Sequence, residues 1–356
     1  MDQETAAELP ISRWGVGEVT VGRRVIVRRR LSAAEAAASD KKVTDVIGHV
    51  VSLAPLRVRP QLRAGVPAET SVPAVEFATE DIVVIKALPD HPVRNSDIRA
   101  VEVATAKAFP GIAHVEEAGW LLRAGDGITE RSNSALPISP SASTQPVPLE
   151  QIRCFYAAHE LPVRIAIPDR IAKPAQALVA NPQWQVGPDI VVMTRQLTEP
   201  LPDPAHSDSS ITVDIADQPD KDWLDLYHFR GAALPEHALE LLRQDIDGRM
   251  CFGRLCMPDP NQPDHRRTVA ITRGTLTESD DGRVWLGFSA VEVAADMRRK
   301  GLGRLLGIQM LHWGASQGAD ASYLQVLAAN VAGISLYRSL GFSEHHRHRY
   351  AELLEA

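Results

Sequence analysis

Arg298-Arg299-Lys300-Gly301-Leu302-Gly303-Arg304-Leu305-Leu306 follows a strand-like run, Val284 to Val293, near the end of this 356-residue chain. A glycine-rich turn between a strand and an amphipathic helix directs backbone N–H groups and the positive end of the helix dipole at one point. Proteins hold pyrophosphate in this way. The stretch therefore predicts a site for a phosphorylated ligand.

Two common glycine-rich loops do not fit this stretch. The dinucleotide fingerprint needs a third glycine at position 306, where the chain has Leu306. The Walker loop needs a Gly-Lys-Ser or Gly-Lys-Thr five residues after Gly301, and the chain has none there. The pattern that remains is Arg-x-x-Gly-x-Gly at a strand-to-helix junction.

The segments after the loop follow in a regular order. Leu302 to Ser316 has the apolar spacing of an amphipathic helix, which Gly318 closes. Ala321 to Leu327 has the composition of a buried strand. Asn330 to Phe342 then ends in the pattern Leu-Tyr-x-x-x-Gly-Phe.

The loop and the later Asn and Leu-Tyr-x-x-x-Gly-Phe pattern, correctly spaced, resemble the two signatures of the GNAT N-acetyltransferase superfamily. The resemblance covers roughly residues 210 to 356. It implies an acyltransferase that uses acetyl-CoA as co-substrate, requires no metal and transfers an acetyl group to a primary amine. The acceptor, a small molecule or a protein lysine, is left open, as is the preferred acyl chain.

The resemblance also implies how acetyl-CoA would lie on this chain. Its pantetheine arm would pair with the strand edge at Val291 and Val293, as an added strand does, and Asn330 would bond the same arm. The pyrophosphate would lie on the loop, where glycines permit close approach and basic side chains add charge. The predicted loop residues are Arg298, Arg299, Lys300, Gly301, Leu302, Gly303 and Arg304.

Tyr337 is the predicted catalytic residue. Collapse of the tetrahedral species expels CoA thiolate, which a positioned hydroxyl can protonate. A tyrosine pKa of about 10 against about 8.5 for a thiol makes this transfer uphill by only about 2 kcal/mol. The alternative is that Tyr337 only packs beneath the cofactor.

A general base is harder to find in the sequence. Glu292 is the carboxylate nearest the expected cofactor edge, but strand alternation can equally make it a solvated or structural glutamate. Gly287 falls where some superfamily members place a catalytic glutamate. We therefore expect a water chain or a residue from elsewhere to complete the proton path.

The acceptor side is predicted upstream of the loop. Asp220 to Tyr227 and Pro235 to Gln244 have the character of two helices, and a polar connection lies between them. Within it, His228 and Arg230 are candidates for binding a substrate carboxylate or assisting proton transfer. Loop scaffolding is the alternative.

The length implies more than one domain. Residues 93–199 repeat a strand, helix, strand, helix, strand order without the phosphate loop, and Thr198 to Ser210 is a Pro- and Ser-rich linker. The predicted fold class is α+β, a tandem GNAT similar in plan to mycothiol synthase. A degenerate half at 93–199 precedes the acetyltransferase domain at 208–356.

Residues 10–90 contain short β-rich runs that suit a small SH3-like barrel. A barrel before a tandem GNAT resembles an actinobacterial family often labelled histone acetyltransferase-like. Arg23, Arg24 and the run Arg28 to Arg30 favour a solvated or salt-bridged edge strand over a nucleic-acid site. We expect the barrel to pack on the catalytic part or to mediate oligomerisation.

Composition limits the remaining possibilities. The net charge of -7 argues against a nucleic-acid partner, and the absence of a long apolar run or signal peptide predicts a cytoplasmic protein. Cys154, Cys251 and Cys256 have the spacing of reduced thiols. His345, His346 and His348 are expected on the surface rather than at a metal site. A CoA-binding sensor or assembly protein without turnover is the alternative function.

Overall fold

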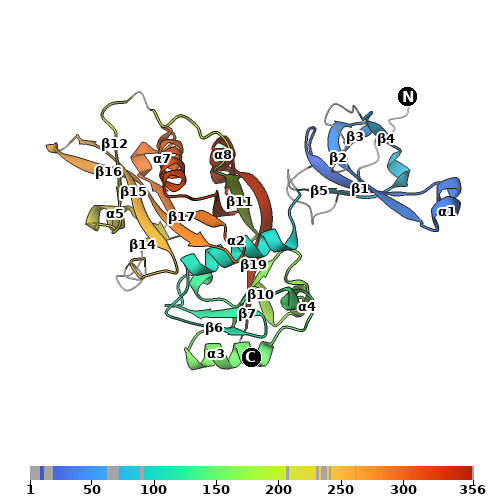
Figure 1. The fold of residues 1–356 in the computed structure, drawn as a ribbon, viewed down its shortest axis with the longest axis horizontal. Helices are drawn as coiled ribbons and strands as arrows, with labels where there is room; N and C mark the ends of the chain where they lie inside the picture. The colour runs from blue at the N-terminus through green and yellow to red at the C-terminus, as the bar shows by residue number, and fades with distance from the viewer. Residues whose placement is uncertain are drawn as a thin grey trace. The chain divides into compact units, whose positions relative to one another are not determined.

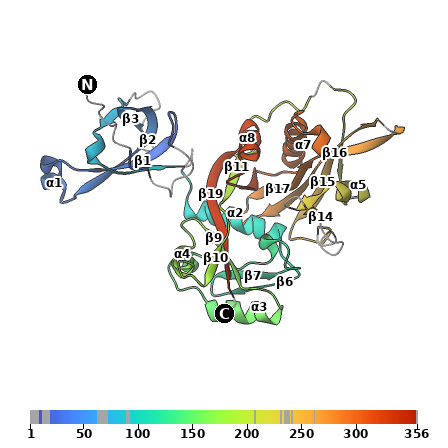
Figure 2. The ribbon, with the colours of Figure 1, turned by 180° about the vertical axis from the view of Figure 1, so that it is seen from behind.

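A computed structural model describes residues 9–11, 19–61, 72–88, 92–205, 208–229, 232–233, 239, 242–260 and 262–354. The chain divides into two compact units, Met1–Pro92 and Val93–Ala356. Figure 1 colours the ribbon from the N-terminus to the C-terminus, and Figure 2 gives the reverse view. The predicted domain 10–90 lies within the first unit.

The first unit contains one antiparallel sheet with the strand order β4-β3-β2-β1-β5. Alternation along β1 buries Val25 and Val27 in the apolar core of this sheet. The helix begins at a capping box between Ser32 and Glu35. The elements are β1 Arg24–Arg30, α1 Ala33–Ser39, β2 Val43–Leu53, β3 Leu56–Pro60, β4 Val75–Phe77, η1 Thr79–Asp81 and β5 Ile82–Ala87.

Arg28 and Arg29 of β1 form ion pairs, as predicted. Nε of Arg28 lies 2.8 Å from Oδ1 of Asp45, and Nη2 of Arg29 lies 2.6 Å from Oε1 of Glu35. The predicted edge position was wrong, because β1 pairs with β2 on one side and β5 on the other. A central strand satisfies its backbone hydrogen bonds on both edges.

The first half of the second unit carries a small sheet, β6-β7-β8. Figures 1 and 2 show α2 between this sheet and the large one. The elements are α2 Asn95–Ala108, β6 Ala113–Glu117, β7 Trp120–Ala124, η2 Glu130–Ser132, β8 Leu136–Pro137, η3 Pro140–Ser143, α3 Leu149–Ala158, β9 Arg164–Pro168, α4 Lys173–Leu178, β10 Trp184–Val186 and β11 Ile190–Gln196.

From the sequence alone, Ile128 to Leu136 is predicted to be a strand, and this prediction was wrong. Ile128 to Leu136 is a turn and a short 3-10 helix that leads into β8. The cause is Asn133, whose Oδ1 accepts hydrogen bonds from the backbone N–H groups of Gly125 at 2.7 Å and Gly127 at 3.0 Å. These bonds fold the segment back on itself.

The second half contains most of the large sheet. The predicted helix Leu302–Ser316 and strand Ala321–Leu327 are confirmed, while most of the predicted helix 235–244 lies outside the described residues. The elements are β12 Thr212–Ala216, α5 Lys221–Leu226, β13 His228–Phe229, β14 Ala232–Ala233, β15 Arg249–Asp259, β16 Gln262–Glu278, β17 Val284–Val293, η4 Ala295–Met297, α7 Leu302–Ser316, β18 Ala321–Leu327, α8 Val331–Ser339 and β19 Ser343–Leu353.

From the sequence, Arg249 to Met257 and Thr268 to Leu276 are predicted to be strands joined by the polar segment Pro258 to Arg267, but β15 and β16 are longer. Pairing continues from Met257 opposite Arg267 to Asp259 opposite Gln262, through a segment expected to be a connection. Nη2 of Arg266 donates to the carbonyl oxygen of Cys256 at 2.9 Å and helps to hold the two arms together. A polar strand can extend beyond the hydrophobic core when its backbone forms hydrogen bonds with the neighbouring strand.

The two halves of the second unit share the nine-stranded sheet, which runs β10-β19-β11-β18-β17-β16-β15-β12, with β9 also paired to β19. Strand β11 of the first half lies between β18 and β19 of the second. Strand β19 in turn pairs with β9 and β10 of the first half. Figure 1 shows β11 beside β19. A proposal of two GNAT-like halves, 93–199 and 208–356, must therefore include exchanged strands.

Two predictions concern the whole chain. The three cysteines are free, as predicted. Among the helices in the described parts of the chain, none is long and apolar enough to cross a membrane. The cytoplasmic location stays a prediction.

Candidate functional site

Strands β17 and β18 separate in the middle of the large sheet. They pair in parallel only from Trp285 opposite Ala321 to Phe288 opposite Leu324. Strand β17 then shifts its register against β16, and Ala290 has a positive φ of 51°. Among the described strands, none pairs with the edge of β17 that faces β18 beyond Phe288. An extended ligand can bond to such an edge.

The loop after β17 enters helix α7 through residues at positive φ. Arg299 has φ 62° and Gly301 has φ 81°. A Cβ on Gly301 would meet nothing within 4 Å, so backbone conformation rather than space favours glycine there. The first helical bond runs from the N–H of Leu305 to the carbonyl of Gly301. The N–H groups of 302–304 therefore have no partner within the helix and can bind an anion.

The separated strands and the loop line one cleft of about 710 Å³. The predicted residues that line it are His228, Val291, Glu292, Val293, Arg298, Arg299, Gly301, Leu302, Gly303, Arg304, Asn330 and Tyr337. Lys300 is the exception, because its side chain lines a different depression and its Nζ lies 3.4 Å from Sδ of Met297. Arg230 lies outside the described residues.

Comparison with protein families gives two matches that together span most of the chain. The family described as "Probable histone acetyltransferase Rv0428c C-terminal" matches residues 95–351, and "Rv0428c N-terminal Sm-like domain" matches residues 19–87. The probable histone acetyltransferase Rv0428c of Mycobacterium tuberculosis is 35% identical over 331 residues, which cover 93% of this chain and 94% of that protein. This chain belongs to the Rv0428c family of GNAT acetyltransferases.

Other matches agree with this family. An uncharacterized N-acetyltransferase, YobR of Bacillus subtilis, is 27% identical over 71% of this chain and 98% of its own length. The solved structure of a GCN5-related N-acetyltransferase from Kribbella flavida shares the fold, with a TM-score of 0.51 and 15% identity, over 73% of this chain and 96% of that one. The chain is therefore an acyltransferase with the GNAT fold, preceded by a small β domain that the family model describes as Sm-like.

The space around Gly287 on β17 leaves no room for a glutamate side chain at this position. A Cβ there would lie 2.6 Å from both Oγ1 of Thr275 and the hydroxyl of Tyr323. Real Cβ atoms essentially never approach that closely. Buried Tyr323 therefore occupies the space that a side chain at 287 would need.

Glu292 lines the cleft but already has a partner. Its Oε1 accepts a hydrogen bond of 3.1 Å from Nη2 of Arg298. Nε of Arg298 also donates to the carbonyl oxygen of Val293 at 3.1 Å. The pair therefore fixes the loop to the end of β17, and this contact favours the structural alternative for Glu292 over the base.

Tyr337 lies on α8 with 9% of its surface exposed. Its ring packs edge-on against Phe342, and its hydroxyl has no hydrogen-bond partner among the described residues. Burial raises the pKa of Tyr337 to about 12. The hydroxyl of Tyr337 therefore keeps its proton at neutral pH and can donate a hydrogen bond.

His228 is held in one tautomer by the backbone. Its Nδ1 lies 2.9 Å from the carbonyl oxygen of Leu226. A carbonyl oxygen only accepts, so Nδ1 carries the proton and the neutral ring keeps its lone pair on Nε2. A half-buried imidazole that lines the cleft in this state can take a proton from a substrate.

Asn330, which lines the cleft, has a structural role as a helix cap. It is the N-cap of α8, and its Oδ1 accepts a hydrogen bond of 2.9 Å from the N–H of Gly333. This bond satisfies one of the unpaired donors at the start of the helix. The predicted contact with a ligand would then come from the remaining groups of Asn330.

A second, smaller pocket of about 70 Å³ adjoins the cleft, and sequence reasoning missed it. Both are lined by Arg131, Tyr227, Ser289 and Ala290. Arg131 comes from the first half of the unit and the other three from the second. No motif marks such a pocket, because residues far apart in the chain form it only after the halves pack together.

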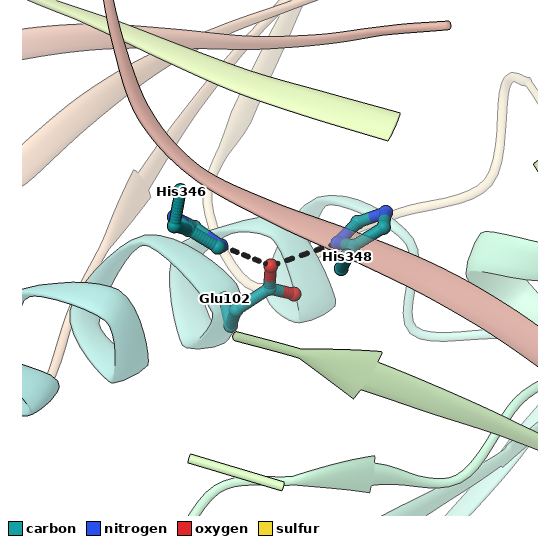
Figure 3. Close-up of side chains that lie close together, drawn as sticks. All are labelled: Glu102, His346 and His348. Atoms are coloured by element: carbon teal, nitrogen blue, oxygen red, sulfur yellow. Dashed lines mark hydrogen bonds and ion pairs between the residues drawn. The ribbon is translucent and has the colours of Figure 1, made fainter. Parts of the chain in front are cut away.

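Glu102, His346 and His348 form a buried cluster away from the cleft (Figure 3). The predicted surface position of the histidines was wrong for His346 and His348, which are each 2% exposed. The reason is strand exchange, because β11 and the first half cover β19. Burial, and then the adjoining His346, lower the pKa of His345 to about 2.

The cluster is a candidate metal centre by composition but a hydrogen-bonded group by geometry. Oε1 of Glu102 accepts hydrogen bonds from Nε2 of His346 at 2.7 Å and Nδ1 of His348 at 2.9 Å (Figure 3). Tetrahedral zinc ligands at their usual bond lengths lie roughly 3.3 Å apart. The shorter separations fit direct bonds between the side chains, and the cluster joins α2 to β19.

Proposed function

We propose that this protein is an acetyl-CoA-dependent N-acetyltransferase in which a primary amine attacks acetyl-CoA directly within a ternary complex. The observation that carries the proposal is that the large cleft and the second pocket share Tyr227, Ser289 and Ala290 as lining residues. One opening suits a long cofactor and the other a smaller acceptor. Their shared wall would be the place of transfer.

The residues of the cleft fit acetyl-CoA. The unpaired edge of β17 at Val291 and Val293 offers backbone partners to the pantetheine arm. Gln325, on β18, lines the same cleft, and its Nε2 is buried with no hydrogen-bond partner among the described residues. It is a further donor that sequence reasoning missed. The N–H groups at the start of α7, with Arg298, Arg299 and Arg304, would hold the pyrophosphate.

The proposed transfer needs one base and one stabilising donor. The amine nitrogen forms a bond to the acetyl carbon, the carbon–sulfur bond breaks, and its electron pair leaves with the sulfur. His228 would take the amine proton on Nε2. Tyr337 would donate a hydrogen bond to the developing thiolate. The products are the N-acetyl amine and CoA.

The proposed acceptor is a primary amine, without a choice between a protein lysine and a small molecule. The name of the Rv0428c relative, a probable histone acetyltransferase, suggests a protein lysine. A small amine is the alternative acceptor, because the second pocket has a volume of about 70 Å³. The net charge of -7 still argues against nucleic acid as a partner, and oligomerisation through the N-terminal unit stays a prediction.

Calorimetric titration of acetyl-CoA into the full chain tests the cofactor site. We expect micromolar binding with one site per chain. Release of free CoA thiol with a library of amines then tests turnover. Binding without turnover would favour a CoA sensor or assembly protein, and no binding would refute the proposed function.

A further inference from the structure

The pocket beside the cleft contains a buried cation that has no anionic partner among the residues that the structure describes. Arg273, on β16, is 2% exposed and lines the pocket. Its Nη2 donates to the carbonyl oxygen of Ala108 at 3.2 Å and lies 3.1 Å from Sδ of Met250. Among the described residues, Nε and Nη1 have no hydrogen-bond partner, and no carboxylate forms an ion pair with Arg273. Those two atoms carry three of the five guanidinium donors.

Burial of such a charge is unfavourable unless something compensates it. Burial lowers the pKa of Arg273 to about 10, so the group stays charged at neutral pH. The Ala108 carbonyl at the C-terminal end of α2 supplies part of the compensation, since that end carries partial negative charge. The unpaired donors of Arg273 are therefore free to bind an acceptor that enters the pocket and offsets the rest of the charge.

A second arginine lies on the same aromatic ring. The guanidinium carbon of Arg273 lies 5.0 Å from the ring centroid of Phe109, and that of Arg131 lies 4.7 Å from it. Arg131 lines both the pocket and the cleft. Two cations on one ring repel each other unless an anion lies near them.

The other polar groups of the pocket do not cancel this charge. Asp126 is the one carboxylate among the described lining residues, and its Oδ1 accepts a hydrogen bond of 3.1 Å from the N–H of Ile128. Oγ of Ser289, a residue that lines both the pocket and the cleft, is buried with no hydrogen-bond partner in the described part of the chain. The pocket therefore offers a net positive charge and several unused donors.

We infer that this pocket binds the carboxylate of the acceptor, so that the substrate is an amine that also carries a carboxylate. The inference rests on the proposed acetyl transfer and adds the class of acceptor. Arg273 and Arg131 would bind the carboxylate, and the amine would lie at Ser289, next to the cleft. Charge-assisted bonds to arginine suit this task.

The same charge bears on the protonation state of the amine. Two nearby cations disfavour an ammonium group and so favour the neutral amine that attacks the acetyl carbon. They also disfavour a polybasic segment as acceptor. A lysine in a basic tail would therefore be a poorer acceptor than an amino acid.

The test compares amino acids with their carboxamides, each as acceptor in the release of CoA thiol by the full chain. We expect kcat/KM to favour the carboxylate by about tenfold or more, as loss of a hydrogen bond to a charged group implies. Arg131→Gln should remove most of this preference through KM. Arg283→Gln is the matched control, because Arg283 also stacks on an aromatic ring, that of Trp285, but lines neither pocket.

Arg273→Gln is examined alongside, with thermal unfolding to check that it folds. Equal use of acids and amides, or a preference that persists in Arg131→Gln, would overturn the inference. If no amino acid is acetylated, each amino acid and its carboxamide are titrated into CoA-saturated protein. The inference is also overturned if the carboxylates do not bind more tightly than the amides. Loss of acetyl-CoA binding in the wild type would instead refute the proposed function.

Discussion

Glu102 accepts a hydrogen bond of 2.7 Å from Nε2 of His346, although 244 positions separate the two residues in the chain. The contact joins α2 of the first half to β19 of the second. Both side chains are almost fully buried, so water cannot replace either partner. The exchanged strand is therefore held by a charged contact as well as by its ladder.

Glu102→Gln should destabilise the second unit. Burial alone would raise the pKa of Glu102, but His348 and His346 outweigh it and hold that pKa below its usual range. The ionised carboxylate therefore stabilises the fold above the unfolded pKa of about 4.3, and this contribution is lost as pH falls through the folded pKa. We expect a loss of about 3 kcal/mol at pH 7 in urea unfolding.

The loss should become smaller at pH 3. Glu116→Gln, at an exposed position on β6, is the control and should change little. An equal loss in both variants, or a difference between wild type and Glu102→Gln that is the same at both pH values, would contradict the prediction.

Gly301→Val should weaken acetyl-CoA binding by tenfold or more. The positive φ strains any β-branched residue, by roughly 1 to 3 kcal/mol, and relaxation would move the N–H groups at the start of α7. Calorimetry gives the affinity. Gly282→Val is the matched control, since Gly282 has φ 77° and equally open space but lies outside the cleft. Equal binding by both variants would count against the loop.

Tyr337→Phe should reduce kcat by about tenfold to hundredfold and leave acetyl-CoA affinity within about threefold. The hydroxyl has no partner among the described residues, so its loss should change unfolding free energy by less than about 0.5 kcal/mol. Tyr350→Phe is the control, because Tyr350 is also 9% exposed and lines neither pocket. Unchanged kcat would leave Tyr337 with a packing role only.

His228→Asn should lower kcat with little effect on acetyl-CoA binding. Asparagine can keep the hydrogen bond to the Leu226 carbonyl but has no base in place of Nε2. Measurement of kcat at saturating acetyl-CoA and amine, beside the calorimetric affinity for acetyl-CoA, checks this prediction. His312→Gln is the control, since Nε2 of His312 bonds the Pro202 carbonyl outside the cleft. An unchanged kcat in His228→Asn would assign the base to another residue.

The sequence predicted those parts of the site whose signals are local. Helix α7 and strand β18 begin and end at the predicted residues, because apolar spacing and glycine caps act between near neighbours. Eleven of the twelve predicted residues that line the cleft lie between Val291 and Tyr337, in segments that follow one another around the parallel pair β17 and β18. The twelfth, His228, lies in the connection after α5. The sequence did not predict the ion pair of Glu292 with Arg298, because the alternation of side chains along a strand does not determine which partner each side chain contacts.

Contacts between distant segments were decided only by the tertiary structure. The sequence by itself determined the GNAT order, the glycine-rich loop before α7 and the place of Tyr337, because each depends on backbone preferences within a few residues. The folded chain decided the exchange of β11 and β19, the burial of His346 and His348, and the pocket of Arg131 and Arg273. Strand pairing and charge burial depend on which surfaces meet, and no local pattern encodes that choice.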